Sequence, residues 1–137
     1  MSDKDVPPYG TGDTSFQNAG GEEGLRRLVD RFYDAMATLP EARTIFKMHP
    51  KDIEVSKDKL ALFLCGWLGG PKLFREKYGP IRIPIAHKHL PIGPKERDAW
   101  MQCMKIAVSE QTHWREDFQS YFLREIYVPA ERSRNRD

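Results

Sequence analysis

The chain has 137 residues, of which 39% are apolar and 31% are charged, with 22 Lys and Arg against 20 Asp and Glu. Its length is sufficient for one core without metal or disulfide staples, and its aromatic content of 11% excludes a disordered chain. The net charge of +2 is too small to indicate a nucleic-acid partner. No apolar run approaches the roughly 20 residues that cross a bilayer, and no signal-peptide pattern is visible, so we expect a cytoplasmic protein that does not enter a membrane.

The first 38 residues divide into an arm and a helix. Residues 1–20 are rich in Gly, Pro and small polar residues, which predicts a mobile arm with at most one helical turn from Asp13. From Glu22, apolar residues recur at steps of three and four, which predicts an amphipathic helix over 22–38. Its apolar positions are Leu25, Leu28, Val29, Phe32, Tyr33 and Met36.

Breaks at proline and glycine divide the next segment. Pro40 can occupy a first helical position, which predicts a short turn or helix over 41–46 that ends before Pro50. Asp52 is a possible cap for a helix that runs to Leu68, where a Gly-Gly-Pro sequence stops it.

The second half of the chain is also helical. A short helix is predicted over 71–78, and the stretch 81–93 has no sustained period, which indicates a loop. A long helix is expected from Pro94, and a last one from about Trp114 to Pro129. Because no run of alternating β-branched residues occurs, the sequence predicts an all-α fold.

Few residues are candidates for chemistry. Cys65 and Cys103 lie in apolar helical patterns without a metal-ligand spacing, so we interpret them as buried thiols. Glu22, Glu23 and Glu125 lack the Glu-x-x-His spacing that lines di-iron bundles, and no nucleophile elbow or phosphate-binding glycine loop occurs, which argues against di-iron, hydrolase and nucleotide sites.

His87 and His89 are the first informative pair. Imidazole is a common ligand of iron or zinc, and one histidine on an apolar helical protein is a route to haem binding. Residue type alone favours the alternative of two solvated loop histidines. Spacing does not choose between them, since a two-residue step on a helix turns by about 200°.

Tyr33, Trp100 and His49 are ambiguous in the same way. Tyr33 and Trp100 lie on apolar helical faces, where their polar atoms bond either a backbone carbonyl or a ligand. His49 is in a connection, where an exposed loop histidine is the simpler interpretation.

Four segments taken together resemble the group II truncated haemoglobins. They are Leu28–Tyr33 (LVDRFY), Trp67–Pro71 (WLGGP), His87–Gly93 (HKHLPIG) and Glu96–Met104 (ERDAWMQCM). Each is a weak signal alone, but the four appear in family order. The resemblance covers about residues 20 to 127.

This resemblance implies a shortened globin fold in which two antiparallel helix pairs stack two-on-two around one haem b. The globin domain would span residues 21–128, between the mobile arm of residues 1–20 and a charged tail over 129–137. The irregular stretch 81–93 would correspond to the extended loop that replaces most of the haem-carrying helix in this family.

The resemblance also implies which residues hold the haem. Counting back from Trp100 places the proximal, metal-binding residue on His87, with His89 at the rim. Ala86 stands where relatives often carry an Arg that meets a propionate. Other expected haem contacts are Ser56 and Leu60 over the iron, Phe63 and Leu64 against the porphyrin, and Tyr78, Arg82 and Lys88 as substitutes near the propionates.

On the opposite, distal face, Tyr33 and Trp100 match the family's hydrogen-bond donors. His49 is expected to be the third, with Phe46 competing for that position and otherwise lining the haem pocket. Whether His49 or Tyr33 coordinates ferric iron is left open by the sequence.

The function implied is a haem protein that binds O₂ at ferrous iron with polar distal stabilisation. Slow O₂ release suits nitric oxide dioxygenation or peroxide detoxification, with carbon monoxide as a further ligand and an unidentified reductase as partner. The alternatives are a reversible oxygen-binding or gas-sensing module without turnover, and a helical interaction domain without haem. We expect a monomer or a weak dimer.

Overall fold

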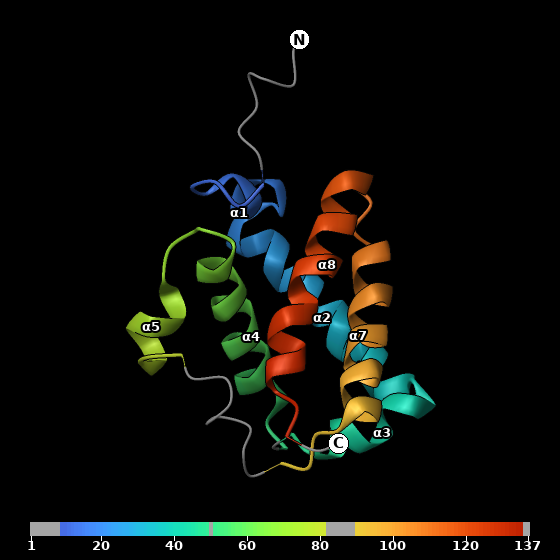
Figure 1. Cartoon of the computed structure of the whole chain (residues 1–137). Helices are drawn as coiled ribbons and strands as arrows, with labels where there is room; N and C mark the ends of the chain where they lie inside the picture. Colours follow the sequence, from blue (N-terminus) through green and yellow to red (C-terminus); the bar gives the residue numbers. More distant parts are fainter. Residues whose placement is uncertain (1–8, 50, 82–89, 136–137) are drawn as a thin grey trace.

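A computed structural model describes residues 9–49, 51–81 and 90–135 of the chain (Figure 1). All regular elements in these ranges are helices: α1 (Thr14–Asn18), α2 (Gly21–Thr38), η2 (Pro40–Ala42), α3 (Arg43–Lys47), α4 (Ile53–Trp67), α5 (Leu73–Tyr78), α7 (Pro94–Ser109) and α8 (Glu116–Arg132). No helix in the described ranges combines the length and the apolar character that a membrane span requires.

The local signals explain where the two central helices lie. The predicted apolar stripe of α2 is buried, with Leu25, Leu28 and Phe32 fully enclosed. Helix α4 starts at the predicted cap, where the Asp52 carboxylate accepts a hydrogen bond of 3.2 Å from the Glu54 amide. It ends before Gly69, whose φ of +91° is readily adopted only by glycine.

Helix α2 is at the centre of the molecule. It packs against α4 on one side and α7 on the other, while α7 pairs with α8 and α5 packs against α4 (Figure 1). Two helix pairs, α2 with α4 and α7 with α8, therefore enclose the core, as the two-on-two arrangement requires.

The start of the chain differs from the expected mobile arm. Ser15 and Ala19 are fully buried, and the Phe16 ring packs on Gly70 so closely that a Cβ there would lie 2.6 Å from it. The Trp114 indole donates a hydrogen bond of 3.1 Å to the Ala19 carbonyl. Residues 14–20 thus pack against the globular body, because the helix-ending glycines leave room for an aromatic anchor.

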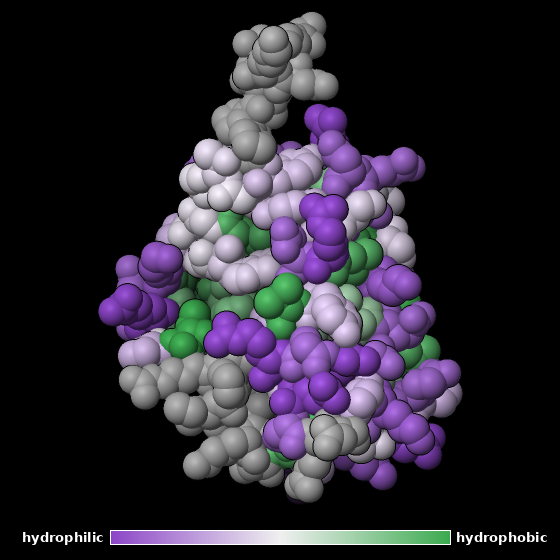
Figure 2. Space-filling view, in the orientation of Figure 1, coloured by the Kyte–Doolittle hydropathy of each residue, from purple (hydrophilic) through white to green (hydrophobic). Residues whose placement is uncertain are grey.

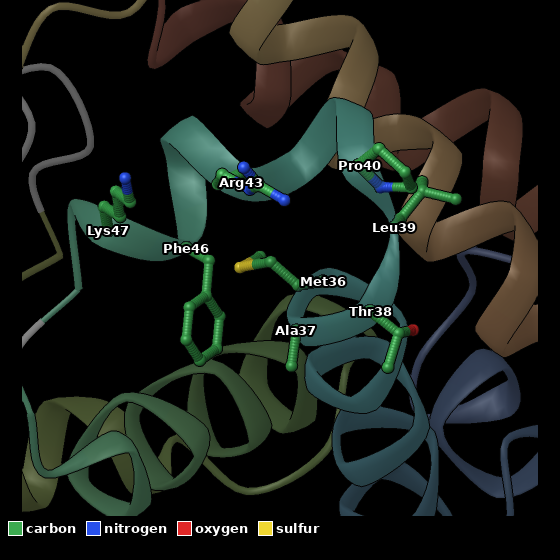
Figure 3. A pocket seen from close by; sticks show the side chains of 8 residues that line it. All are labelled: Met36, Ala37, Thr38, Leu39, Pro40, Arg43, Phe46 and Lys47. Atoms are coloured by element: carbon green, nitrogen blue, oxygen red, sulfur yellow. The ribbon is translucent and has the colours of Figure 1, made fainter.

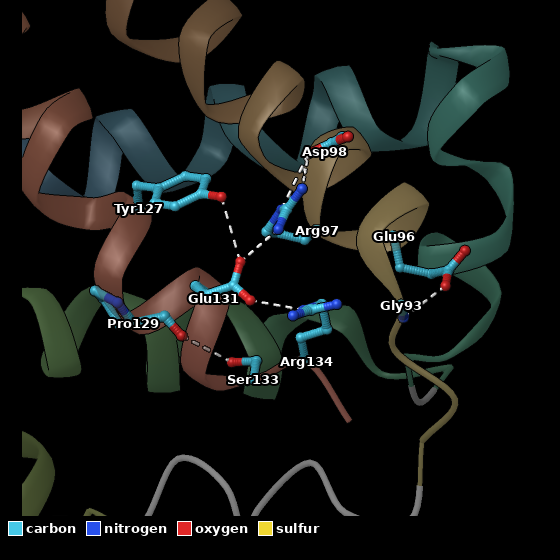
Figure 4. A network of polar contacts seen from close by, with 9 residues as sticks. All are labelled: Gly93, Glu96, Arg97, Asp98, Tyr127, Pro129, Glu131, Ser133 and Arg134. Carbon is cyan, nitrogen blue, oxygen red and sulfur yellow. Dashed lines mark hydrogen bonds and ion pairs between the residues drawn. The ribbon is translucent and has the colours of Figure 1, made fainter. Parts of the chain in front are cut away.

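The last helix also differs from its predicted end. We expected it to stop near Pro129, but α8 continues to Arg132 with Pro129 inside. Ala130 is buried, and Glu131 forms an ion pair with Arg97 of α7 (Figure 4). These tertiary contacts override the local tendency of proline to end a helix.

Candidate functional site

Tyr33 lies in the second half of α2 and is 6% exposed. Its ring meets that of Phe32 edge-on, with centroids 5.0 Å apart. Burial raises the pKa of the Tyr33 hydroxyl well above its usual value, so the group keeps its proton throughout the physiological range. Tyr33 is therefore a permanent hydrogen-bond donor.

His49 follows α3 and provides the acceptor for Tyr33. Its Nδ1 lies 2.8 Å from the Ile45 carbonyl oxygen, which can only accept, so Nδ1 carries the proton of the neutral ring. Nε2 is then left as an acceptor, 3.4 Å from the Tyr33 hydroxyl. The two rings are nearly perpendicular, at 88°. The Tyr33–His49 bond is long, so the hydroxyl can exchange it for another acceptor.

Trp100 lies on α7 and joins the same cluster through Phe32. The two ring centroids are 5.0 Å apart at 61°. Trp100 is half-buried, and its indole N–H donates to no acceptor among the described residues. Phe32 thus contacts both Tyr33 and Trp100, and Tyr33 in turn contacts His49.

Phe46, the competitor of His49, lies beside a separate pocket. A cavity of about 380 Å³ is formed by the end of α2, η2 and α3 (Figure 3). The Phe46 ring and the Met36 sulfur both project into this space, and Phe46 is 36% exposed. The other lining residues are Ala37, Thr38, Leu39, Pro40, Arg43 and Lys47. His49 is hydrogen-bonded to Tyr33, a contact for which Phe46 has no polar group.

One face of α4 carries the residues expected over the iron and porphyrin. Ser56, Leu60 and Phe63 are half-buried and recur at helical steps that continue to Trp67. The Trp67 ring contacts Phe122 of α8 with centroids 5.9 Å apart, so this face of α4 is turned toward the α7–α8 pair. Leu64 is completely buried in the core, whereas Phe63 is half-buried. Phe63 is therefore the better placed of the two to contact a porphyrin.

Half-buried apolar side chains on α4 and α7 leave part of the core incompletely covered. Leu60, Phe63 and Trp100 border the packed core without being enclosed by it. Figure 2 shows hydrophobic surface in the hollow between α5 and α8, the side where α4 lies in Figure 1. A flat apolar group would cover such side chains.

Of the three residues expected near the propionates, the structure describes only Tyr78. The Tyr78 hydroxyl donates a 2.6 Å hydrogen bond to the Asp58 carboxylate, so a propionate contact would have to replace that bond. Arg82 and Lys88, together with the expected ligand His87 and its neighbour His89, lie outside the described residues.

Asp58 is a structural residue that the sequence patterns did not reveal. It accepts hydrogen bonds from Arg26 of α2 at 3.0 Å and from Lys77 of α5 at 2.7 Å, besides Tyr78. These contacts hold the pKa of the Asp58 carboxyl well below its usual range. No local pattern marks Asp58, since its partners lie 19 to 32 residues away.

The interpretation of both cysteines as buried thiols is confirmed. Cys65 and Cys103 are completely buried and unpaired. Burial raises the pKa of each thiol to about 11. Neither thiol belongs to the distal cluster, so both are core residues.

Comparison with known proteins decides the family. Residues 14–126 match the profile of the bacterial-like globin family. The chain belongs to this family. The globin is 34% identical to the group II 2-on-2 haemoglobin of Agrobacterium tumefaciens, covering 90% of this chain and 95% of that one with a TM-score of 0.83. It is therefore a group II truncated haemoglobin with the all-α two-on-two fold.

Two further relatives come from Bacillus subtilis. The globin is 40% identical over 88 residues to the group 2 truncated haemoglobin YjbI of strain 168, and the match spans 64% of each chain. A structure of the truncated oxygen-avid haemoglobin of this organism has a TM-score of 0.78 at 30% identity, covering 88% of this chain and 98% of that one.

Membership of the globin family implies a haem cofactor, and the described residues fit one. Haem needs apolar side chains against its faces, which the half-buried Leu60 and Phe63 offer. Its sixth ligand position needs a polar but neutral surrounding, which the protonated Tyr33 and the indole of Trp100 offer. The expectation that His87 binds the iron stays a prediction.

Proposed function

We propose that this globin binds O₂ at a ferrous haem b, retains it by distal hydrogen bonds and uses it to convert nitric oxide to nitrate or to remove peroxide. His87 would bind the iron through Nε2, and Phe63 and Leu60 would contact the porphyrin. When bound, the haem supplies the affinity for diatomic ligands and the electrons that activate them. The observation that carries the proposal is the arrangement of Tyr33, His49 and Trp100.

Tyr33 acts as an exchangeable donor in this proposal. Its bond to His49 is 3.4 Å long, so little is lost when the hydroxyl turns to a ligand that carries partial negative charge. The Ile45 carbonyl keeps His49 in the tautomer that accepts at Nε2, so the Tyr33 hydroxyl donates to His49 again when the ligand departs. The hydroxyl stays protonated because burial disfavours the phenolate.

Trp100 supplies the second donor, since its N–H has no acceptor among the described residues. Each neutral hydrogen bond contributes about 1 kcal/mol net, so the two donors would slow O₂ release by about thirtyfold. The relative described as oxygen-avid supports this direction. A protein that releases O₂ slowly suits reaction better than delivery.

The proposed reaction combines nitric oxide with O₂ and one electron to give nitrate. The O–O bond breaks, and both oxygen atoms are transferred to nitrogen. A bound ferrous haem would supply this electron, and a cellular reductase would have to return it after each turnover. Tyr33 and Trp100 would hold the O₂ during the encounter by their hydrogen bonds.

Absorption spectroscopy tests the haem site first. The purified protein should show a Soret band that survives in Tyr33→Phe and is lost or strongly altered in His87→Ala. His89→Ala serves as the matched control and should leave the band unchanged. Loss of the band in His89→Ala alone would transfer the ligand to that residue, and a protein with no band under any haem supply would eliminate the haem function.

Mixing the oxygenated protein with nitric oxide tests the reaction. We expect one nitrate per haem together with conversion to the ferric form, and continued turnover when a flavin-based reductant is present. Tyr33→Phe should release O₂ about fivefold to tenfold faster. Oxygenated protein that loses O₂ reversibly and yields no nitrate would favour the alternative, a reversible oxygen-binding or gas-sensing module.

A further inference from the structure

Asn135, near the end of the described chain, forms three hydrogen bonds with the segment Leu90–Ile92. Its backbone amide donates to the Ile92 carbonyl at 2.8 Å. Its side-chain oxygen accepts from the Ile92 amide at 3.0 Å, and its side-chain nitrogen donates to the Leu90 carbonyl at 2.6 Å. One exposed residue therefore satisfies three backbone groups of a segment that has no regular structure.

The end of α8 and the residues that lead to Asn135 are held against α7. Glu131 pairs with Arg97 of α7 and with Arg134, whose Nε lies 2.6 Å from the Glu131 carboxylate (Figure 4). The Arg97 guanidinium lies over the Tyr127 ring, 5.3 Å from its centroid. The Ser133 hydroxyl donates to the Pro129 carbonyl at 3.1 Å. The end of α8 is thus fixed to α7 before the chain reaches Asn135.

The segment Leu90–Ile92 is also fixed at its other end. It leads into α7 through Gly93, whose amide donates to the Glu96 carboxylate at 2.7 Å (Figure 4). Because α7 and the end of α8 are joined by Arg97 and Glu131, Asn135 and Gly93 hold this segment from one rigid support.

The contacts made by Asn135 lie beyond the part of the chain that matches the globin family. That match ends at residue 126, within α8. The family match therefore includes Leu90–Ile92 but not Asn135. Leu90, in contrast, follows His87 by only three residues.

We propose that Asn135 is a positioning residue for the proximal side of the haem. It fixes the backbone at Leu90–Ile92, and Leu90 follows His87 by three residues in the sequence. The proposal rests on the proposed function, in which His87 is the haem ligand. Asn135 acts through the backbone and touches neither the haem nor the gaseous ligand in this role.

The test compares Asn135→Ala with Asn18→Ala in the holoprotein. Asn18 is a matched control, because its side chain also donates to a backbone carbonyl, that of Thr14 at 2.8 Å, but within α1. In Asn135→Ala we expect haem transfer to an excess of apomyoglobin to accelerate about fivefold to tenfold. We also expect the iron–histidine stretching band in the resonance Raman spectrum of the ferrous protein to shift or broaden. Asn18→Ala should change neither readout.

Asn135→Asp separates the two side-chain bonds. The carboxylate keeps an acceptor for the Ile92 amide but loses the donor to the Leu90 carbonyl. The rate of haem transfer from this variant should therefore lie between the rates of the wild type and Asn135→Ala. Amide hydrogen exchange at Ile92 should increase in the same order. Unchanged haem transfer and an unchanged iron–histidine band in Asn135→Ala, despite faster exchange at Ile92, would overturn the positioning role.

Failure of the proposed function has a different signature. If His87→Ala retained the wild-type spectrum, His87 would not be the ligand, whereas exchange at Ile92 would still report whether Asn135 holds this segment. Unchanged exchange at Ile92 in Asn135→Ala, with His87 established as the ligand, would overturn the present inference alone.

Discussion

Two tryptophans show how this globin uses similar aromatic clusters for different purposes. Trp114 is 4% exposed, packs on Phe118 and Phe122 with centroids 4.8 and 5.3 Å away, and donates its N–H to the Ala19 carbonyl. Trp100 packs on Phe32 in a similar geometry, but it is half-buried and its N–H reaches no described acceptor. At the closed end, around Trp114, the ring is buried and its N–H is hydrogen-bonded. At the open end, around Trp100, the ring is partly exposed and its N–H is left to donate to a ligand.

The comparison predicts the largest effect at the closed end. Trp114→Ala removes a buried ring and leaves the Ala19 carbonyl without its partner, so we expect a loss of about 3–5 kcal/mol in the free energy of unfolding. Trp100→Ala should cost less than half as much, because its ring is already partly exposed. Guanidinium unfolding followed by circular dichroism measures both. Equal losses would show that the two clusters contribute alike to stability.

The second prediction concerns α5, which packs against α4 and has no buried residue. Asp58 joins it to α2 and α4 through Arg26, Lys77 and Tyr78, and its side chain is 18% exposed. Asp58→Asn should therefore cost about 1–2 kcal/mol. In contrast to the Trp114 cluster, this contribution depends on charge.

The pH dependence follows from the direction of the Asp58 shift. Its pKa is lowered in the folded protein, so its contribution is complete above the unfolded value near pH 4 and is lost as the pH falls toward the folded value. Melting temperatures between pH 7 and 3 should decrease less steeply in Asp58→Asn than in the wild type. Parallel curves would exclude Asp58 as a source of acid sensitivity.

The third prediction concerns O₂ release, for which we expect a larger effect at Trp100 than at Trp114. Trp100→Phe keeps the ring contact with Phe32 but removes the N–H, so O₂ should leave about fivefold to tenfold faster, with a stability change below about 1 kcal/mol. Trp114→Phe is the control and should leave the O₂ release rate unchanged while it lowers stability. Stopped-flow displacement of O₂ by carbon monoxide measures the rates. Faster release in both variants would mean that the closed end also controls the ligand.

The sequence predicted the elements whose signals are local. The stripe of α2, the Asp52 cap and the glycine stop of α4 all act within a few residues, and the helices start and end close to the predicted positions. The resemblance implied that Tyr33 and Trp100 share the distal face, and their rings both contact Phe32; their role toward the haem stays a prediction.

What the sequence missed depends on distant partners. Phe16 is held by a space that Gly70 leaves, and α8 passes Pro129 because Glu131 has a partner on α7. Asp58 and Asn135 look like ordinary polar residues until the fold places carbonyls, amides and cations around them. Such contacts have no period and no spacing, so no local pattern announces them.

The smallest effect is expected in the reactivity of the two cysteine thiols. This reactivity shows how far solvent enters the core from the end around Trp100. Cys103 follows Trp100 by three residues on α7 and Cys65 lies on α4, yet both are completely buried. With a pKa of about 11, only about one thiol in a thousand is ionised at pH 8. We therefore expect almost no reaction with an aromatic disulfide reagent over an hour in the folded protein, and two thiols per chain in guanidinium. Rapid reaction of Cys103, identified by its loss in Cys103→Ser, would mean that solvent reaches past Trp100 into the core, so that the open end would not stop at the distal cluster.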